Sequence, residues 1–330
     1  MSDSQFRQDL VSGDWIVVAP SRRHKSSDIA VKIPARKRVP KENCPFEDPQ
    51  KNGNGEPILV VPDRNKWRLQ LIPNKYPVVA PHKKNCSLIT REGPYAAMEG
   101  RGYHEVFITR DHNGNFPKLA ADDARELFES FQSRYRVLSK DKCLSYILIF
   151  HNWGPAAGAS VYHPHYQLIA IPVIPPDVEH SFAGSIRFSK ENKKCVHCVM
   201  LEWEKKEKKR IVYENKGAIV FAPFVSRNSF ELRIFPKRHE SFFEDSPPET
   251  IKSVAEALQI SLQKIEKNLN DPDYNFFIHT APVRNKSKFS HYHWHLEILP
   301  KTNIWAGFEL GTGIEIVAVD PNEAAKLLRN

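Results

Sequence analysis

The chain contains two copies of one sequence pattern, and this duplication restricts the possible folds more than any other feature. Apolar residues at helical spacing predict one helix over residues 122–140 and another over residues 246–269. A strand-like apolar run precedes each helix and another follows it. Each half then reaches an H-x-H triplet, His163-Pro164-His165 or His293-Trp294-His295. We therefore expect two units built as strand, helix, strand, loop and strand.

Histidines recur at matched intervals in the two copies. His112 and His151 are 39 residues apart, as His239 and His279 are 40 apart. The next interval is 12 residues, to His163, in the first copy and 14 residues, to His293, in the second. The matched sets are His112, His151 and His163 in the first copy, and His239, His279 and His293 in the second. This repetition predicts an α+β fold in which each unit pairs an antiparallel sheet with a helix. The proline-rich stretch Pro172–Pro176 and the following Asp177–Ser189 indicate a domain boundary, which gives domains 1–176 and 177–330.

Composition excludes several classes of protein. In 330 residues, 41% are hydrophobic and 26% are charged, as in globular proteins. No run of 18 apolar residues predicts a membrane span, and the polar start Met1–Gln5 shows no signal peptide, so we expect a cytoplasmic protein without a membrane partner. The net charge of +9 favours anionic partners. The excess is spread along the chain, which favours a phosphorylated small molecule over nucleic acid.

Three residues around the first triplet suggest phosphoryl chemistry. His163, His165 and Gln167 alternate along a predicted strand, so their side chains share one face. The preceding loop, Gly154–Ser160, is rich in small residues that let a ligand approach the backbone, and Ser160 adds a hydroxyl. A neutral imidazole can attack phosphorus, and Gln167 could stabilise charge on the phosphoryl oxygens. The alternative is that these histidines only pack in the core or on the surface.

Two sets of residues carry the pattern of a metal site. Cys195 and Cys198 in a C-x-x-C spacing, together with His239 and His293, form a common tetrahedral zinc set. The matching positions in the first half are Cys44, Glu47, His112 and His163, with a carboxylate where the second cysteine would stand. The alternatives are a redox pair at Cys195 and Cys198, or unused thiols at either place. Five cysteines do not form a disulfide framework.

The segment His151–Gln167, HNWGPAAGASVYHPHYQ, resembles the active-site segment of galactose-1-phosphate uridylyltransferases, which belong to the histidine-triad superfamily. Other similar segments cover nearly the whole chain: Trp15–Arg22, Pro73–Pro77, Phe235–His239, His279–Pro282, His291–Pro300 and Gly307–Gly313. The resemblance implies two tandem histidine-triad-like units in a duplicated half-barrel-like architecture. It also implies one or two zinc ions per chain and a homodimer.

The resemblance further implies individual roles. His165 would be the nucleophile that carries the nucleotidyl group, His163 would bind metal and orient His165, and Ser160 and Gln167 would hold the phosphoryl group. The residues expected to contact the nucleotide sugar are Arg22, Asn74, Asn152, Gly158, Phe308 and Glu309, the last two across a dimer interface. The chain departs from the family pattern at Glu47, where many members have cysteine. In some members a histidine pair binds the second metal, so His295 could replace one second-site ligand.

The implied reaction is a double displacement. UDP-glucose would give its uridylyl group to His165, glucose-1-phosphate would leave, and galactose-1-phosphate would take the group. The chain is also similar to plant ADP-glucose phosphorylases, which share the C-x-x-C site and would transfer an adenylyl group to phosphate. A third hypothesis is a zinc-stabilised nucleotide- or RNA-binding protein without turnover, against which the intact His-Pro-His-x-Gln argues.

Overall fold

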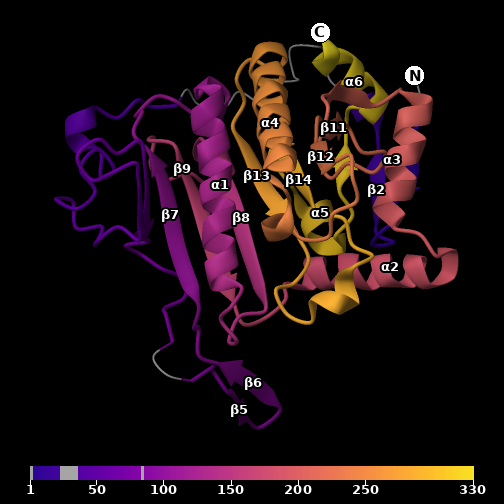
Figure 1. The fold of residues 1–330 in the computed structure, drawn as a ribbon. Coiled ribbons are helices and arrows are strands. Elements are labelled where there is room, and N and C mark those ends of the chain that lie inside the picture. Colours follow the sequence, from indigo (N-terminus) through magenta and orange to yellow (C-terminus); the bar gives the residue numbers. More distant parts are fainter. Residues whose placement is uncertain (1–2, 23–35, 83–84) are drawn as a thin grey trace.

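Ten strands form one antiparallel sheet that runs through the whole molecule (Figure 1). The computed structural model describes residues 3–22, 36–82 and 85–330. From one edge inward, the first half of the chain supplies β3 (Leu59–Val61), β4 (Leu69–Pro73), β7 (Tyr103–Thr109), β9 (His165–Ile171) and β8 (Tyr146–Trp153). From the other edge inward, the second half supplies β10 (Ile211–Glu214), β11 (Ala218–Phe221), β12 (Leu232–Pro236), β14 (His295–Pro300) and β13 (Tyr274–His279).

The two halves repeat the same strand order and meet at the centre, where β8 pairs with β13. This arrangement confirms the predicted α+β fold and the repeated unit of strand, helix, strand, loop and strand. The repeat is longer than the sequence suggested, because β3 and β4 in one half match β10 and β11 in the other. The sheet crosses from one half to the other without a break, and the domain division at 176/177 stays a prediction.

Two long helices cover one face of this sheet (Figure 1). They are α1 (Ala121–Leu138) and α4 (Pro248–Asn268), which correspond to the two predicted helices. Their apolar stripes, with Phe128 and Phe131 on α1 and Leu258 on α4, join one buried core with the sheet residues that face them. Burying each such side chain contributes about 1.5–3 kcal/mol to folding.

The opposite face of the sheet, which we call the open face, carries polar side chains. Alternate residues of a strand point to one face, and directly paired residues of neighbouring strands share it. Gln167 on β9 pairs with Phe150 on β8, and Phe150 pairs with Phe277 on β13, which in turn pairs with Glu297 on β14. The open face therefore runs continuously from Gln167 in the first half to Glu297 in the second.

Shorter elements surround the second half. The strands β1 (Gln5–Gln8) and β2 (Trp15–Val18) pair with β15 (Ile316–Val317) to form a small three-stranded sheet. The helices are α2 (Pro176–Asn192), α3 (Val196–Glu207), α5 (Gly307–Thr312) and α6 (Pro321–Arg329). In the described parts of the chain, every helix is too short or too polar to cross a bilayer. The segment Asp177–Ser189, expected at a domain boundary, lies within α2.

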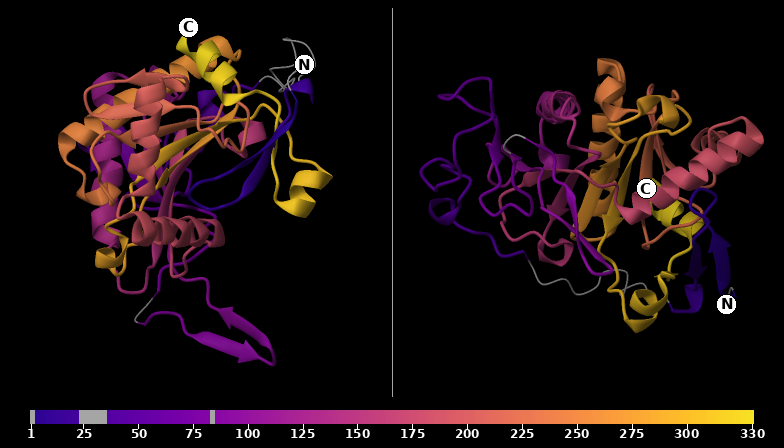
Figure 2. Two further views of the ribbon diagram at one scale, coloured as in Figure 1. Left: turned by 90° about the vertical axis from the view of Figure 1, so that its right-hand side faces the viewer. Right: turned by 90° about the horizontal axis from the view of Figure 1, so that it is seen from below.

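A hairpin of β5 (Ile89–Glu92) and β6 (Tyr95–Met98) projects away from the body (Figures 1 and 2). A disulfide between Cys86 and Cys143 ties the chain leading into this hairpin to the turn between α1 and β8. The expectation that the five cysteines form no disulfide framework needs this correction, since one pair is bonded. Cysteines 57 residues apart give no local sequence signal.

Candidate functional site

The first-half metal set lies together at the edge of the open face, beside β9. Cys44 Sγ is 3.5 Å from His163 Nδ1, and Glu47 Oε1 is 3.1 Å from His112 Nδ1 and 3.8 Å from His163 Nδ1. Cys44 follows a short 3₁₀ turn, His112 follows β7, and His163 immediately precedes β9. The structure thus brings together four residues that are up to 119 positions apart in the sequence.

The hydrogen bonds around this first-half set orient its imidazoles. His112 Nε2 donates to the carbonyl of Val39 at 2.8 Å, and His163 Nε2 donates to the carbonyl of Thr109 at 2.7 Å. With Nε2 as the donor, each ring directs Nδ1 toward the centre of the set, as metal-binding histidines do. Glu47 Oε1 and His112 Nδ1 are buried and have no hydrogen-bond partner among the described residues. Two facing acceptors of this kind fit a cation between them.

Burial also favours the neutral, metal-binding form of His163. Its side chain is fully buried, and burial lowers its pKa to about 4. Burial raises the pKa of the Cys44 thiol, so metal binding there must displace a firmly held proton. Cys44 and Phe46 pack with Ile72, Val106 and Ile108, and the last two pair with Gln167 and His165, so the set lies against the open face beside the predicted nucleophile.

The second-half metal set repeats this arrangement on the other side of the molecule. Cys195 caps the start of α3, Cys198 lies in its first turn, His239 follows β12, and His293 precedes β14. Their ligand atoms all lie within 4.8 Å of one another. Cys198 Sγ is 3.3 Å from His239 Nδ1 and 3.6 Å from His293 Nδ1, while His239 Nε2 donates to the Ser290 carbonyl. A hydrogen bond from Cys198, helped by the nearby histidines, holds the pKa of the Cys195 thiol well below its usual range.

His165, the predicted nucleophile, is the first residue of β9 and only 7% exposed. Its Nδ1 donates to the carbonyl of His163 at 2.9 Å, which leaves the lone pair on Nε2. Phe46 packs against the ring, with 5.3 Å between the ring centroids. Burial lowers the pKa of His165, so the ring is neutral at neutral pH. A buried, neutral imidazole of fixed tautomer has the form that a nucleophile requires.

His151 supports His165 from the helix-covered side of the sheet. His151 Nδ1 donates to the carbonyl of His165 at 2.7 Å, and burial lowers the pKa of His151 to about 3. The sequence analysis matched His151 and His279 as equivalent positions of the two repeats, and the strand register shows that this match was wrong. Residue Phe276 pairs with His151, and His279 is three positions further along β13, so the two histidines point to opposite faces.

His104 on β7, to which the sequence gave no role, links two predicted site residues. The backbone N–H of Val78 donates to His104 Nδ1 at 3.2 Å, so Nδ1 is an acceptor and Nε2 carries a proton. His104 Nε2 donates to Gln167 Oε1 at 2.9 Å, and the Asn74 side-chain nitrogen lies 2.9 Å from the same Nε2. With its oxygen engaged, Gln167 turns its NH₂ group away from His104. A lone histidine in an apolar strand gave no sequence signal for this role.

The remaining predicted substrate residues are less closely grouped. Asn152 accepts a hydrogen bond from Asn275 at 2.8 Å. Gly158 adopts a φ of +86°, and a Cβ added to it would lie 3.8 Å from the side chain of Asn152. Ser160 is exposed and lines a cavity of about 310 Å³ together with Arg36 and Lys37. Arg22 is exposed at the end of a 3₁₀ turn, next to residues 23–35, which lie outside the described part. The prolines and lysines of residues 30–41 predict a surface loop, and half of this segment lies outside the described part.

Phe308 and Glu309 lie on α5, in the second half. Phe308 is 46% exposed, and Glu309 accepts a hydrogen bond from the backbone of Ala306 at 3.0 Å. Glu309 lines a cavity of about 390 Å³ on the second half of the open face, which we call the second-half pocket. Within one chain, therefore, Glu309 lies beside the strands of the second half and away from His165, which is in the first half.

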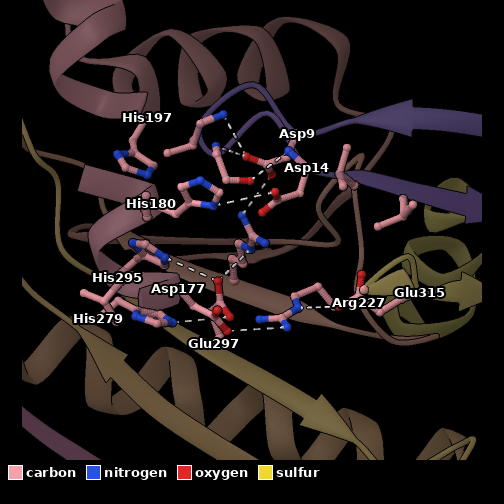
Figure 3. Close-up of a pocket in the computed structure, with 18 of the residues that line it drawn as sticks. Asp9, Asp14, Asp177, His180, His197, Arg227, His279, His295, Glu297 and Glu315 are labelled. Carbon is pink, nitrogen blue, oxygen red and sulfur yellow. Dashed lines mark hydrogen bonds and ion pairs between the residues drawn. The ribbon is translucent and has the colours of Figure 1, made fainter. Parts of the chain in front are cut away.

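The second-half pocket, shown in Figure 3, resembles the His165 site in its backbone contacts but differs in its chemistry. His295 Nδ1 lies 3.2 Å from the His293 carbonyl, and His165 Nδ1 lies 2.9 Å from that of His163. The residue two positions on is Glu297 instead of glutamine, and it contacts His295 Nε2 at 3.4 Å and His279 Nε2 at 3.5 Å. Against the effect of burial, Arg233 at 3.1 Å holds the pKa of Glu297 well below its usual range. A carboxylate here would repel a phosphoryl group.

His295 does not join the second-half metal set. Its nearest potential ligand groups are His279 and Glu297, whereas Cys195, Cys198, His239 and His293 form a set of their own. The hypothesis that His295 replaces a ligand of that set is therefore not supported by the geometry.

Known proteins resemble this chain over nearly its whole length. The family model described as galactose-1-phosphate uridyl transferase, N-terminal domain, matches residues 2–175, and one for a domain of unknown function matches residues 101–329. ADP-glucose phosphorylase of Arabidopsis thaliana is 31% identical over 98% of this chain and 92% of its own length. Galactose-1-phosphate uridylyltransferase of Thermotoga maritima is 32% identical over 80% of this chain and 85% of its own. A crystal structure of the Arabidopsis thaliana ADP-glucose phosphorylase with bound ADP-glucose covers 99% of both chains, with a TM-score of 0.82 and 29% identity.

Proposed function

The chain belongs to the galactose-1-phosphate uridyl transferase family, and on this basis we propose that it is a nucleotidyltransferase with His165 as its covalent nucleophile. One observation carries the proposal: His165 Nδ1 donates to the His163 carbonyl, which leaves Nε2 as the only free nucleophilic atom of a buried, neutral ring. His151 supports the same strand end from the other face of the sheet.

The reaction proceeds in two displacements. His165 Nε2 attacks the α-phosphorus of a nucleoside diphosphate sugar, a P–N bond forms, and the bond from the α-phosphorus to the bridging oxygen breaks, so that a sugar-1-phosphate leaves. A phosphate oxygen of the acceptor then attacks the same phosphorus, and the P–N bond breaks to restore His165. Gln167 donates its NH₂ group to the phosphoryl oxygens, and its orientation by His104 is in place before substrate binds.

The other predicted residues act on the substrate around this centre. Ser160 donates its hydroxyl to the transferred phosphoryl group, and Arg22, Asn74, Asn152 and Gly158 contact the nucleotide sugar. Phe308 and Glu309 contact the hexose from a second subunit of a homodimer. Their position away from His165 within one chain, and the exposure of Phe308, support this assignment to a partner.

We propose zinc as the metal of both sets. Two thiolates and two imidazoles in the second half suit zinc, whereas Glu47 in the first half replaces a soft sulfur with a hard oxygen. Bound zinc would join distant segments of the chain and contribute to the stability of the fold. Cys44, Glu47, His112 and His163 would hold the first ion beside His165, and Cys195, Cys198, His239 and His293 the second.

Two donors are candidates. UDP-glucose, with galactose-1-phosphate as acceptor, follows from the family name and from the Thermotoga maritima relative. ADP-glucose, with phosphate as acceptor, is favoured by the Arabidopsis thaliana relative, which matches this chain over 98% of its length where the uridylyltransferase matches 80%. We propose ADP-glucose as the better donor of the two.

Labelling at the α-phosphorus tests both the chemistry and the donor. Incubation of the protein with α-labelled ADP-glucose or UDP-glucose should leave acid-labile, alkali-stable label on the chain, and the better donor should label faster. His165→Asn should abolish labelling while zinc content is unchanged, and His180→Asn, at an exposed histidine on α2, should label normally. Exchange of labelled glucose-1-phosphate into the donor checks the first displacement alone.

Two outcomes would redirect the proposal. Normal exchange by His165→Asn would refute the covalent mechanism. Tight nucleotide binding without label or exchange, in protein whose zinc sites are full, would favour the zinc-stabilised nucleotide- or RNA-binding protein instead.

A further inference from the structure

A third group of metal-ligating side chains lies where the β5–β6 hairpin joins the body. Cys86 comes from the segment that leads into the hairpin, and Cys143 from the turn between α1 and β8. His82 and Asp141 lie beside them, with His82 Nε2 only 2.7 Å from Asp141 Oδ2. The ligand atoms of His82, Asp141 and Cys143 are within 4.8 Å of one another, and Cys143 is bonded to Cys86.

This group contains the donors of a tetrahedral zinc site. Two sulfurs, one imidazole and one carboxylate are all established zinc ligands. The surroundings already orient the carboxylate, because the backbone N–H of Cys143 donates to Asp141 Oδ1 at 2.9 Å and the Tyr103 hydroxyl donates to Oδ2 at 3.1 Å. These second contacts hold a ligand in place as the outer shell of a metal site does.

The protein leaves this group partly unsatisfied. His82 Nδ1 is buried and has no hydrogen-bond partner among the described residues, although the ring is 19% exposed as a whole. Buried polar atoms normally have a partner, and the second ring nitrogen of His82 has none among the described residues, so this imidazole keeps a lone pair for a ligand that the protein alone does not supply.

We propose that His82, Cys86, Asp141 and Cys143 bind one zinc ion when the disulfide is reduced, and that the disulfide is the metal-free, oxidised form of the same site. A dithiol reductant gives two electrons and two protons to the Cys86–Cys143 bond and becomes a disulfide itself. Zinc then binds the two sulfurs as thiolates, and their two protons are released. In the reverse direction, a disulfide oxidant takes two electrons from the thiolates and is itself reduced to a dithiol, the Cys86–Cys143 bond forms again, and the ion is expelled.

The disulfide form and the zinc form both link the segment before the hairpin to the turn between α1 and β8. The segment before the hairpin leads to the proposed catalytic centre. The segment ending at His82 begins at Asn74, and Val78 within it donates to His104, the residue that orients Gln167. The zinc form and the disulfide form therefore both anchor this segment, whereas reduced protein without metal has neither cross-link. The zinc proposal does not depend on the proposed function.

Zinc counting on the full-length protein tests the site. Wild-type protein is either reduced with a dithiol or oxidised by air, and loosely bound metal is then removed on a weak chelating column. The zinc that remains is measured by elemental mass spectrometry. We expect the reduced protein to retain about one more zinc per chain than the oxidised protein. The Cys86→Ser/Cys143→Ser double variant should lack this extra zinc under both conditions.

Asp141→Asn separates a metal site from a simple disulfide. It keeps both cysteines, so thiol counting should show that the disulfide still forms, which also reports that the region is folded. Its reduced form should lose the extra zinc, whereas Asp122→Asn, an identical change at an exposed aspartate on α1, should keep it. Equal zinc contents in reduced wild type, the double serine variant and Asp141→Asn would overturn the proposal, as would equal contents in reduced and oxidised wild type.

Discussion

Arg233 contacts two buried carboxylates, Glu231 and Glu297, the second of which lines the second-half pocket. Its Nε lies 2.9 Å from Glu231 Oε1 and 3.1 Å from Glu297 Oε1, and its guanidinium is 4.0 Å from Asp9. The side chains of Arg233, Glu231 and Glu297 are each less than 10% exposed. We predict that Arg233→Met strongly destabilises the fold, because methionine fills the space but leaves the carboxylates without their counter-ion.

The contacts set the size of the effect. At an effective dielectric constant of 20, each attraction near 3 Å is worth about 5 kcal/mol. The loss is smaller than their sum, because the desolvation of Arg233 itself is relieved and the carboxylates can take up protons. Breaking a buried ion pair from one side typically costs about 3–5 kcal/mol. We therefore expect the free energy of unfolding to fall by about 4 kcal/mol at pH 7.5.

The effect should also depend on pH in a defined direction. Without Arg233, burial raises the folded-state pKa of Glu231 and Glu297 above the unfolded values, so the folded state binds more protons than the unfolded state. The stability of the variant then falls as pH rises from about 5 to 8, and its deficit against the wild type grows over this range. In the wild type, burial already raises the pKa of Glu231 to about 7.

Urea denaturation at saturating zinc, followed by tryptophan fluorescence, measures this loss. Arg125→Met is the matched control, because Arg125 on α1 is 43% exposed and, among the described residues, pairs with the surface carboxylates of Asp122 and Glu129, so its loss should be below about 1 kcal/mol. Glu231→Gln combined with Arg233→Met should recover part of the stability. A loss for Arg233→Met no larger than that of Arg125→Met would refute the reasoning.

Three further changes probe the metal sets and the centre. Glu47→Cys should raise zinc retention in the presence of a mild chelator, since a thiolate replaces a hard oxygen, and unaltered retention would speak against a zinc site there. Cys195→Ser should remove about one zinc per chain and lower the melting temperature by about 5 °C or more, and unchanged values for both would argue against the second-half set. His104→Phe should lower kcat by about 5- to 150-fold, the equivalent of about 1–3 kcal/mol for a buried hydrogen bond, with zinc content unchanged; an unchanged kcat would show that Gln167 needs no such support.

The sequence predicted the parts of the fold that have a regular apolar pattern. The helices α1 and α4 and the strands beside them stood out because their buried stripes are long. In contrast, α2 buries only Val178, Phe182, Gly184 and Ser185, and so short a stripe beside a run of prolines was taken for a boundary. The strands β3 and β10 are only three and four residues long, too short for a clear period.

The site could be predicted where chemistry and spacing coincide. The H-x-H motifs and the C-x-x-C of the second half led to both candidate metal sets, whose residues lie together in the structure, and to His165, whose role stays a prediction. Residues that act by supporting others, such as His104 and His151, carry no motif, and their roles depend on which strand lies beside them. Matching intervals alone also misplaced His151, because a shift of one residue in a strand exchanges its two faces.

The pairing of β8 with β13 has a mechanical consequence for ligand binding. Backbone hydrogen bonds cross the seam between the two halves over the register Tyr274↔Trp153 to Ile278↔Ile149, so the halves cannot swing apart without breaking the ladder. A ligand at His165 and another in the second-half pocket would thus bind to one continuous sheet at a fixed separation. We expect their binding isotherms within a single chain to be independent, because the β8–β13 ladder fixes the two halves relative to each other.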